Sequence, residues 1–152
     1  MITLEDFRLF CGRTIAGTLA AVDRLDDELV NRRLGHVGAN TPFQLATHAF
    51  SAAEWWCSYV VLGRPSSRVR DDEFVASGTV ADLHVAARRV LALLDDLAPD
   101  LAVATATVHQ PATERPLGQA WTVGAAVLHA YEELAQHLGH LEITVDMLLM
   151  EA

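Results

Sequence analysis

The sequence predicts four helices, and three of them begin with the same capping pattern. In this pattern the threonine side chain accepts a hydrogen bond from the backbone amide three residues later. The acidic or amide side chain of that later residue accepts one from the backbone amide of the threonine. Three threonines have such a partner: Thr3 with Asp6, Thr41 with Gln44, and Thr79 with Asp82. Apolar residues then recur at spacings of three and four, as along one face of a helix. We predict helices over about residues 4–30, 41–62, 79–98 and 122–150.

The connections between these helices indicate the architecture. Residues 63–78 and 99–121 form two connections that are too long for tight turns. Within the second, residues 103–108 alternate in a way that is typical of either a short strand or an extended crossover. Four long helices with two long connections predict an all-α fold, a four-helix bundle with crossover connections. The chain length predicts a single domain over residues 1–152.

The composition disfavours several classes of protein. Hydrophobic residues make up 51% of the chain, enough for a core without disulfides. A net charge of −9 and scattered arginines disfavour nucleic acid as a partner. No stretch reaches the roughly 18 apolar residues of a membrane span, so we expect no membrane partner. Only Cys11 and Cys57 are present, and the N-terminus shows no secretion signal; both features predict a cytoplasmic protein.

The helix predicted at 122–150 has a polar stripe that solubility alone does not explain. Its apolar arc and its acidic face occupy two sides, and a third side is rich in histidine: His129, Glu133, His137 and His140. Glu133 and His137 are four residues apart, so their side chains stack on one face and can reach one ion. The same spacing also suits a simple Glu–His hydrogen bond within the helix.

A third ligand would have to come from another helix, and His48 is the best candidate. It lies in the middle of the helix predicted at 41–62, among small and aromatic neighbours. One glutamate and two histidines leave a coordination position open, as in catalytic metal sites. Zinc, nickel, iron and manganese all suit such ligands. The alternative is that His48 is a core histidine with its hydrogen bonds satisfied.

Two segments resemble a known family. Residues 41–56, TPFQLATHAFSAAEWW, and residues 121–148, WTVGAAVLHAYEELAQHLGHLEITVDML, are similar to the DinB-like superfamily, within it to the mycothiol-dependent maleylpyruvate isomerase and mycothiol S-transferase branch. The run EELAQHLGHLEI carries the most specific likeness. The resemblance implies an up-down-down-up bundle and a metal, usually zinc, held by His48, Glu133 and His137. Maleylpyruvate isomerases carry an additional C-terminal domain that these 152 residues do not include, so the resemblance implies the metal-and-thiol chemistry more than that isomerisation.

The resemblance also implies a reaction. A bound divalent metal would activate a small thiol, mycothiol, for attack on an electrophile. His129 and His140 are candidates for proton transfer or for supporting a ligand, and His129 also competes for a ligand position. Trp55, Tyr59 and Trp121 are candidates for the substrate side, with core packing as the alternative. A homodimer is compatible with a bundle of this size, and no sequence feature fixes its interface.

Other interpretations stay open at this point. The chain can instead be a non-catalytic or vestigial metal- or ligand-binding bundle of the stress-response kind. A ferritin-like di-iron site is disfavoured, because it needs two E-x-x-H motifs and the sequence has none. Cys57 is a conceivable nucleophile, but a buried and inert thiol is the favoured interpretation.

Overall fold

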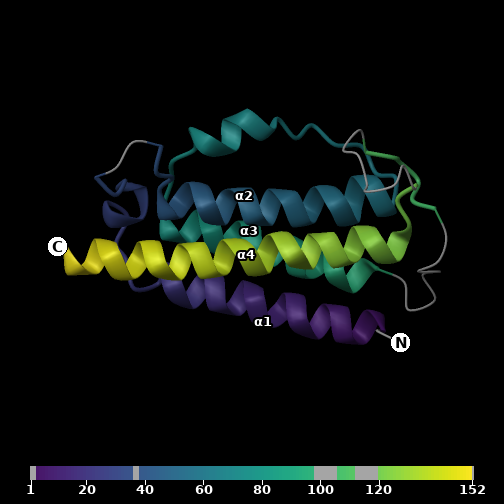
Figure 1. Cartoon of the computed structure of the whole chain (residues 1–152), viewed down its shortest axis with the longest axis horizontal. Coiled ribbons are helices and arrows are strands. Elements are labelled where there is room, and N and C mark those ends of the chain that lie inside the picture. The colour runs from purple at the N-terminus through teal and green to yellow at the C-terminus, as the bar shows by residue number, and fades with distance from the viewer. Residues whose placement is uncertain (1–2, 36–37, 98–105, 112–119, 152) are drawn as a thin grey trace.

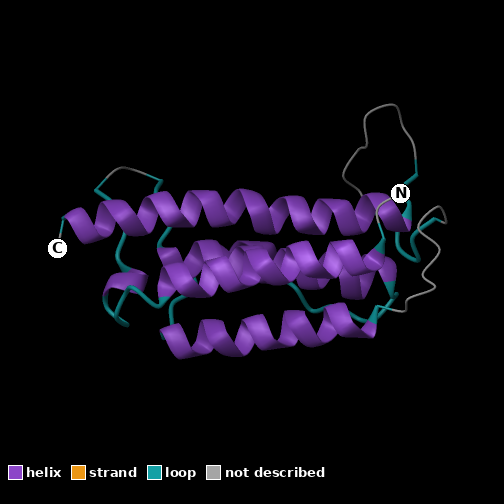
Figure 2. Cartoon of the chain, turned by 90° about the horizontal axis from the view of Figure 1, so that it is seen from below, coloured by secondary structure: helices purple, strands orange, loops and turns teal. Residues whose placement is uncertain are grey.

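The computed structural model describes residues 3–35, 38–97, 106–111 and 120–151, and four α-helices dominate this part of the chain. They are α1 (Leu4–Val22), α2 (Pro42–Glu54), α3 (Val80–Asp96) and α4 (Val123–Met150) (Figure 1). Figure 2 shows helices joined by loops, with no strand among the described residues. The predicted all-α class is therefore confirmed.

The capping pattern seen in the sequence sets the helix starts. Thr3, Thr41 and Thr79 each accept a hydrogen bond from the amide three residues on, and the partner side chain accepts from the threonine amide. Each box satisfies two amides that a helix start would otherwise leave unpaired. Thr122 caps α4 in the simpler way, by accepting from Ala125 N at 3.2 Å.

Contacts between the helices define their directions. Phe10 of α1 packs on Tyr131 of α4, and Gly17 lies against Leu138, so these two helices run parallel. Along α2 the order is reversed, because His48 packs on His137 whereas Trp56, which follows α2, packs on His129. Helix α3 is antiparallel to α1, since Arg8 bonds the Leu94 carbonyl and His84 pairs with Asp23. Figure 1 shows α1 and α4 running one way and α2 and α3 the other.

Helix α2 is the most enclosed element of the bundle. Ten of its 13 residues are buried, including the polar side chains of Gln44 and His48. It packs against both α3 and α4, and the connection after it crosses its outer side (Figure 1). A histidine in the middle of such a helix cannot rely on water, so its ring nitrogens need partners from the protein.

The first helix is shorter than the sequence analysis predicted. It ends at Val22 instead of near residue 30, and a 3₁₀ turn, η1 (Leu29–Asn31), follows. The Asp26 carboxylate accepts hydrogen bonds from the amides of Glu28, at 3.0 Å, and Leu29, at 2.7 Å. These bonds stabilise a turn in place of another helical turn. Leu25 and Val30 are still buried, which explains why the apolar spacing continued beyond the helix.

The second helix keeps its predicted length but changes its winding. After Glu54 the chain continues as a π-helical segment, η2 (Trp55–Val61). Such segments are rare and occur frequently at functional sites. Gly63, with φ of 69°, then ends the helical run in the left-handed region that favours glycine.

The structure describes the whole of the first long connection and part of the second. Residues 63–79 include a 3₁₀ turn, η3 (Arg70–Phe74), which the sequence analysis did not predict. Of the alternating run at 103–108, residues 103–105 lie outside the described part of the chain. Ala106 forms an isolated antiparallel bridge with Thr122, and residues 106–108 belong to no strand. None of the described helices has the length and apolar character that crossing a membrane requires.

Candidate metal centre

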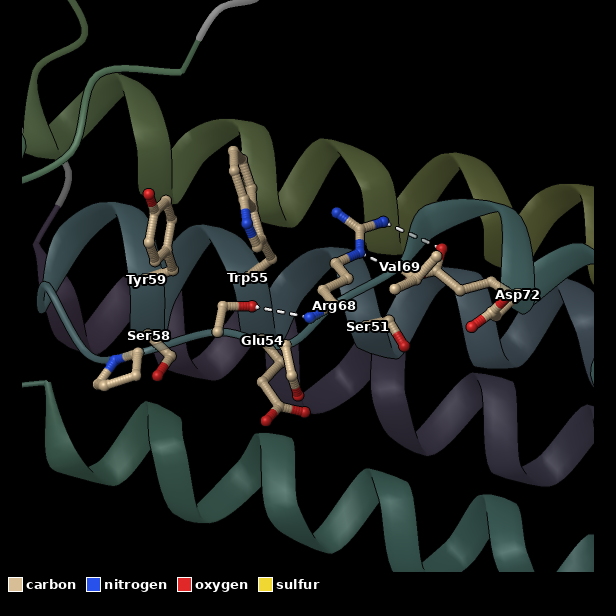
Figure 3. Close-up of a pocket in the computed structure, with 12 residues that line it drawn as sticks. Ser51, Glu54, Trp55, Ser58, Tyr59, Arg68, Val69 and Asp72 are labelled. Atoms are coloured by element: carbon tan, nitrogen blue, oxygen red, sulfur yellow. Dashed lines mark hydrogen bonds and ion pairs between the residues drawn. The ribbon is translucent and has the colours of Figure 1, made fainter.

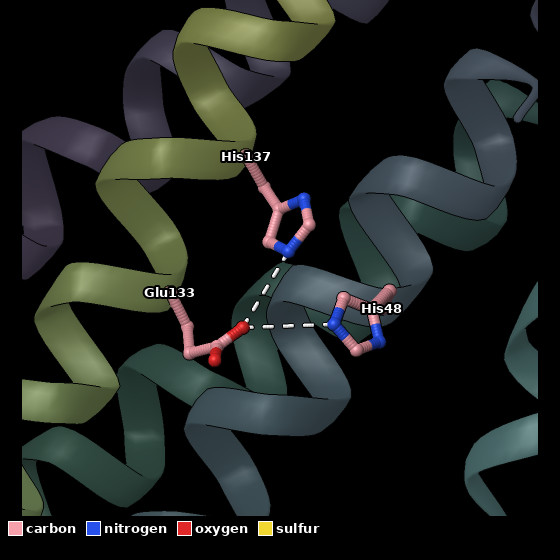
Figure 4. Close-up of side chains that lie close together, drawn as sticks. All are labelled: His48, Glu133 and His137. Atoms are coloured by element: carbon pink, nitrogen blue, oxygen red, sulfur yellow. Dashed lines mark ion pairs between the residues drawn. The ribbon is translucent and has the colours of Figure 1, made fainter. Parts of the chain in front are cut away.

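The three predicted metal ligands converge between α2 and α4. Figure 4 shows His48 on α2 facing Glu133 and His137 on α4. Glu133 Oε2 lies 3.6 Å from His48 Nε2 and 3.4 Å from His137 Nε2. One nitrogen or oxygen atom from each residue lies within 4.8 Å of the other two. Two imidazole nitrogens and one carboxylate oxygen gathered this closely form a donor set that suits a divalent transition metal.

The backbone explains why these side chains meet. Glu133 and His137 are one turn apart on α4, so they lie on one face of that helix. Helix α2 runs antiparallel alongside and places His48 opposite both of them. The His48 side chain is 7% exposed, whereas those of Glu133 and His137 are 25% and 23% exposed. The cluster is therefore buried on the α2 side and accessible from the α4 side.

The charges in the cluster support one another. Hydrogen bonds with His137 and His48 hold the pKa of the Glu133 carboxyl far below its usual range, even though burial opposes the shift. The same interaction with Glu133, followed by one with Glu73, raises the pKa of His48. Glu133 is thus an ionised carboxylate with an oxygen placed between two imidazoles. A carboxylate in that position is ready to bind a cation.

A second carboxylate, which the sequence analysis missed, holds the other side of His48. Glu73, in η3, places Oε2 at 2.6 Å from His48 Nδ1, and its side chain is only 6% exposed. Arg68 binds the same carboxylate twice, with Nε at 2.6 Å from Oε1 and Nη2 at 3.0 Å from Oε2. Burial opposes ionisation of Glu73, but hydrogen bonds from His48 and Arg68 together lower its pKa. The sequence offered little signal for either residue, because they lie in a loop 20 or more positions from His48.

The Glu73 contact fixes the tautomer of His48. An ionised carboxylate only accepts hydrogen bonds, so His48 Nδ1 must carry the proton and donate it. In the neutral imidazole the lone pair is then on Nε2, the atom that faces Glu133 and His137. A histidine that binds a metal through one nitrogen commonly donates the other N–H to a carboxylate. The residues present therefore fit a metal, because His48 Nδ1 donates to Glu73 and the lone pair on Nε2 faces the other two ligands.

The other predicted histidines occupy different positions. His129 Nε2 lies 3.3 Å from Glu133 Oε1, and its Nδ1 lies 2.8 Å from Glu132 Oε2, so His129 borders the cluster. His140 is exposed on α4, and its backbone carbonyl accepts from the Thr144 hydroxyl. The structure brings His129 to the site and leaves His140 outside the three-residue cluster.

The predicted aromatic residues divide into two groups. Trp55 and Tyr59 line a pocket of about 320 Å³, together with Arg68 and Glu73. Trp121 instead packs on Trp56, with ring centroids 4.5 Å apart, and lies against His129 at 5.6 Å. The first group borders the pocket on the outer side of α2, whereas Trp121 belongs to the aromatic packing around His129.

The two cysteines are both buried and free. Burial raises the pKa of the Cys57 thiol to about 12 and raises that of Cys11 well above its usual value. A thiol is nucleophilic as its thiolate, and these shifts keep both groups protonated near neutral pH. This supports the interpretation of Cys57 as an inert core residue.

The fold and the cluster together define a helical-bundle protein with a candidate three-ligand metal centre. The sequence model of the mycothiol S-transferase family matches residues 7–146 of the chain. The protein therefore belongs to this family, which confirms the resemblance drawn from the helices at 41–56 and 121–148. Neither the search of curated proteins nor the search of solved structures found a match.

Proposed function

We propose that the protein is a metal-dependent mycothiol S-transferase whose metal is bound by His48, Glu133 and His137. The observation that carries the proposal is the convergence of two imidazole nitrogens on one carboxylate oxygen, at 3.6 and 3.4 Å. Membership of the mycothiol S-transferase family supports the small thiol as cosubstrate. The antiparallel pairing of α2 with α4 and the parallel pairing of α1 with α4 support a DinB-like, up-down-down-up bundle.

A divalent cation held by His48, Glu133 and His137 would lower the pKa of a small thiol bound to it and so favour the thiolate near neutral pH. The protein contributes the geometry. Glu73 and Arg68 hold His48 in the tautomer that directs Nε2 at the site. Three protein ligands, the number typical of catalytic metal sites, would leave room for the thiol at the metal.

His129 is placed to move a proton at the edge of the site. Its Nε2 lies 3.3 Å from Glu133 Oε1, and its side chain is 29% exposed, so it contacts both the cluster and water. An imidazole can accept and donate a proton, so His129 could take up the proton that a thiol releases. Trp56 and Trp121 pack against this histidine and limit its movement. The electrophile would approach from the same, more accessible α4 side.

The ligand set favours zinc and also accepts nickel, iron or manganese. The first test is the metal content of untagged protein, measured by plasma mass spectrometry. We expect about one metal ion per chain in the wild type and loss of that metal in His48→Ala and Glu133→Ala. Glu142→Ala, which removes an exposed carboxylate from α4, is the matched control and should keep its metal.

A second measurement tests the transfer itself. Consumption of mycothiol in the presence of a thiol-reactive electrophile such as monobromobimane should require the loaded metal. It should fall to the uncatalysed rate in both ligand variants. Wild-type protein that takes up no metal, even after incubation with zinc, would overturn the proposal. Metal without thiol-dependent turnover would instead favour a non-catalytic metal-binding bundle.

A further inference from the structure

Helices α1 and α4 together present an apolar surface to solvent. On α4, Leu128 and Ile143 are 56% and 63% exposed, and Phe10 of α1 is exposed as well. Phe10 packs on Tyr131, three residues from Leu128, so the exposed residues of the two helices adjoin. Figure 1 shows α1 running alongside α4. We call this surface, which runs from Phe10 and Leu128 to Ile143, the α1–α4 face. Single exposed apolar residues are common, whereas several on adjacent helices indicate an interaction surface.

The middle of the α1–α4 face consists of small residues. Ala135 and Gly139 lie between Leu128 and Ile143 on the same side of α4, because the four follow one another at spacings of seven, four and four residues. A Cβ atom added at Gly139 would meet nothing within 4 Å, so the backbone is open at this point. A helix of a partner can therefore approach α4 closely there, with the larger side chains on either side of the crossing.

Two acidic side chains beside this face already have partners within the chain. Asp146 pairs with Arg24 at 2.7 Å, and Glu132 contacts His129 at 2.8 Å. With a net charge of −9, two copies of the chain repel each other in general. A face whose carboxylates are largely neutralised is therefore the favoured place for two copies to meet.

The register of α1 against α4 fixes where the remaining charges lie. Phe10 packs on Tyr131, and Gly17 lies against Leu138. In both pairs the number of the α4 residue exceeds that of the α1 residue by 121, since 131 − 10 and 138 − 17 give the same value. Arg13 therefore lies at the level of position 134 of α4.

The positions of two charges and two apolar side chains suit a two-fold axis. Within the described residues, Arg13 and Glu142 have no ion pair, and they lie eight positions, or about 12 Å, apart along the face. A two-fold axis midway, at position 138, puts each Arg13 opposite Glu142 of a second copy. An axis between positions 135 and 136 puts Leu128 opposite Ile143. Both pairings thus place the axis in the small-residue middle of the face.

The α1–α4 face is also large enough for a dimer. The 19 residues of α1 give it a length of about 28 Å, and two helices side by side are about 20 Å wide, so its flat footprint is on the order of 560 Å². A ridged helix surface buries more accessible area than its flat footprint. Specific interfaces bury about 800 Å² of accessible surface on each partner, so the face is of the required size.

We propose that the α1–α4 face binds the same face of a second copy of this chain, with the two α4 helices antiparallel across a two-fold axis. Each contact then occurs twice, as in every two-fold interface. The inference goes beyond the proposed function and does not depend on it. Glu133 and His137 face α2, so the metal centre lies outside the interface. The pocket lined by Trp55 and Tyr59 lies between α2 and the chain that carries η3, and it stays open as well (Figure 3).

The test measures the mass of the untagged protein by sedimentation velocity over a wide range of concentration. We expect the wild type to reach twice the 16.5 kDa of one chain. Arg13→Glu and Glu142→Arg each replace two attractive contacts by two repulsive ones, so each should weaken dimerisation by about tenfold. The double variant Arg13→Glu/Glu142→Arg restores opposite charges and should recover the dimer. Arg89→Glu, the same change at an exposed position of α3, is the matched control and should dimerise as the wild type does.

A cross-linking experiment locates the interface without changing a charge. Gly139→Cys introduces a thiol close to the proposed axis, and a short bismaleimide should join two copies through it. Ala92→Cys introduces a thiol at an exposed position of α3 and should give no cross-linked dimer. The native Cys11 and Cys57 are buried and do not compete for the reagent. Circular dichroism verifies that each variant keeps its helices.

The outcomes separate this interface from other associations. Loss of the dimer in both single variants, recovery in the double variant and cross-linking at position 139 would establish the proposal. A wild type that stays monomeric at every concentration would overturn it, and so would a dimer that tolerates both single charge reversals. Cross-linking at position 92 but not at position 139 would place the interface on α3 and also overturn it. None of these measurements needs a metal, so their failure leaves the proposed function untouched.

Discussion

Glu73 Oε2 and His48 Nδ1 are 2.6 Å apart, and both side chains are almost fully buried. The contact joins a 3₁₀ turn in a loop to the middle of the most enclosed helix. It determines which nitrogen of His48 carries the proton and therefore which nitrogen can bind a metal. The loop is thus a structural part of the candidate metal centre and more than a connection between α2 and α3.

The first prediction concerns Glu73 itself. Glu73→Ala removes the acceptor for His48 Nδ1–H, and we expect the affinity for zinc to fall by about 10- to 100-fold. Glu73→Gln keeps an acceptor oxygen and should lose less. Competition with a chromophoric chelator measures both values. Glu132→Gln is the control, because Glu132 makes the corresponding contact with His129, which is not one of the three ligands. Equal affinities in Glu73→Ala and wild type would contradict the role given to Glu73.

The second prediction compares two arginines of the same connection. Arg68 is 17% exposed and pairs with the buried Glu73, whereas the partners Arg64 and Asp96 are 47% and 56% exposed. Arg68→Gln leaves a buried carboxylate with less support and should lower the free energy of unfolding by about 1–3 kcal/mol. Arg64→Gln should change it by no more than about 0.5 kcal/mol. Urea unfolding of metal-free protein measures both changes. A loss in Arg64→Gln as large as that in Arg68→Gln would contradict the argument.

The helix starts and the three converging side chains could be predicted because their signals are local. A threonine with a partner three residues later determines a helix start within a few positions, and an i, i+4 pair on one helix must share a face. The placement of His48 opposite that pair came from its position in the second helix and from family likeness. The structure shows the three side chains together, and their binding of a metal stays a prediction.

The features that were missed depend on local competition or on tertiary contacts. The end of α1 at Val22 is set by Asp26, whose turn bonds compete with the helix although the apolar spacing continues. The apolar spacing of three and four residues does not distinguish the π-helical winding of η2 from an α-helix. Glu73 lies 25 residues from His48, and only the path of the loop over α2 brings the two together. None of these follows from sequence periodicity.

The third prediction tests how much the start of α2 depends on its cap. Thr41 and Gln44 are both buried, so the amide of Gln44 cannot turn to water if the Thr41 hydroxyl is lost. Thr41→Ala should lower the free energy of unfolding by about 1–2 kcal/mol. The matching change at the exposed box, Thr3→Ala, should cost less, because water can replace the lost bond. Thermal and urea unfolding measure both losses, and a loss in Thr3→Ala as large as that in Thr41→Ala would contradict the role given to burial.

The fourth prediction concerns the buried thiols and follows from the sign of their pKa shifts. Burial raises the pKa of Cys57 from 9.0 to about 12, so the folded protein keeps this proton where an unfolded chain releases it. The resulting stability is fully present below pH 9 and is lost as pH rises from 9 toward 12. At pH 10 the loss from Cys57 should be about 1 kcal/mol relative to pH 8.

Urea unfolding of the wild type and of Cys57→Ala at pH 8 and pH 10 measures this contribution, since the titrating groups other than Cys11, whose pKa Cys57 also raises, act equally in both proteins. The variant should show the smaller decrease with pH. Iodoacetamide at pH 8 should also leave both cysteines of the folded protein unmodified and label both in urea, because neither thiol is accessible or ionised in the bundle. Rapid labelling of Cys57 in the folded protein would contradict its assignment to the core and restore it as a candidate nucleophile.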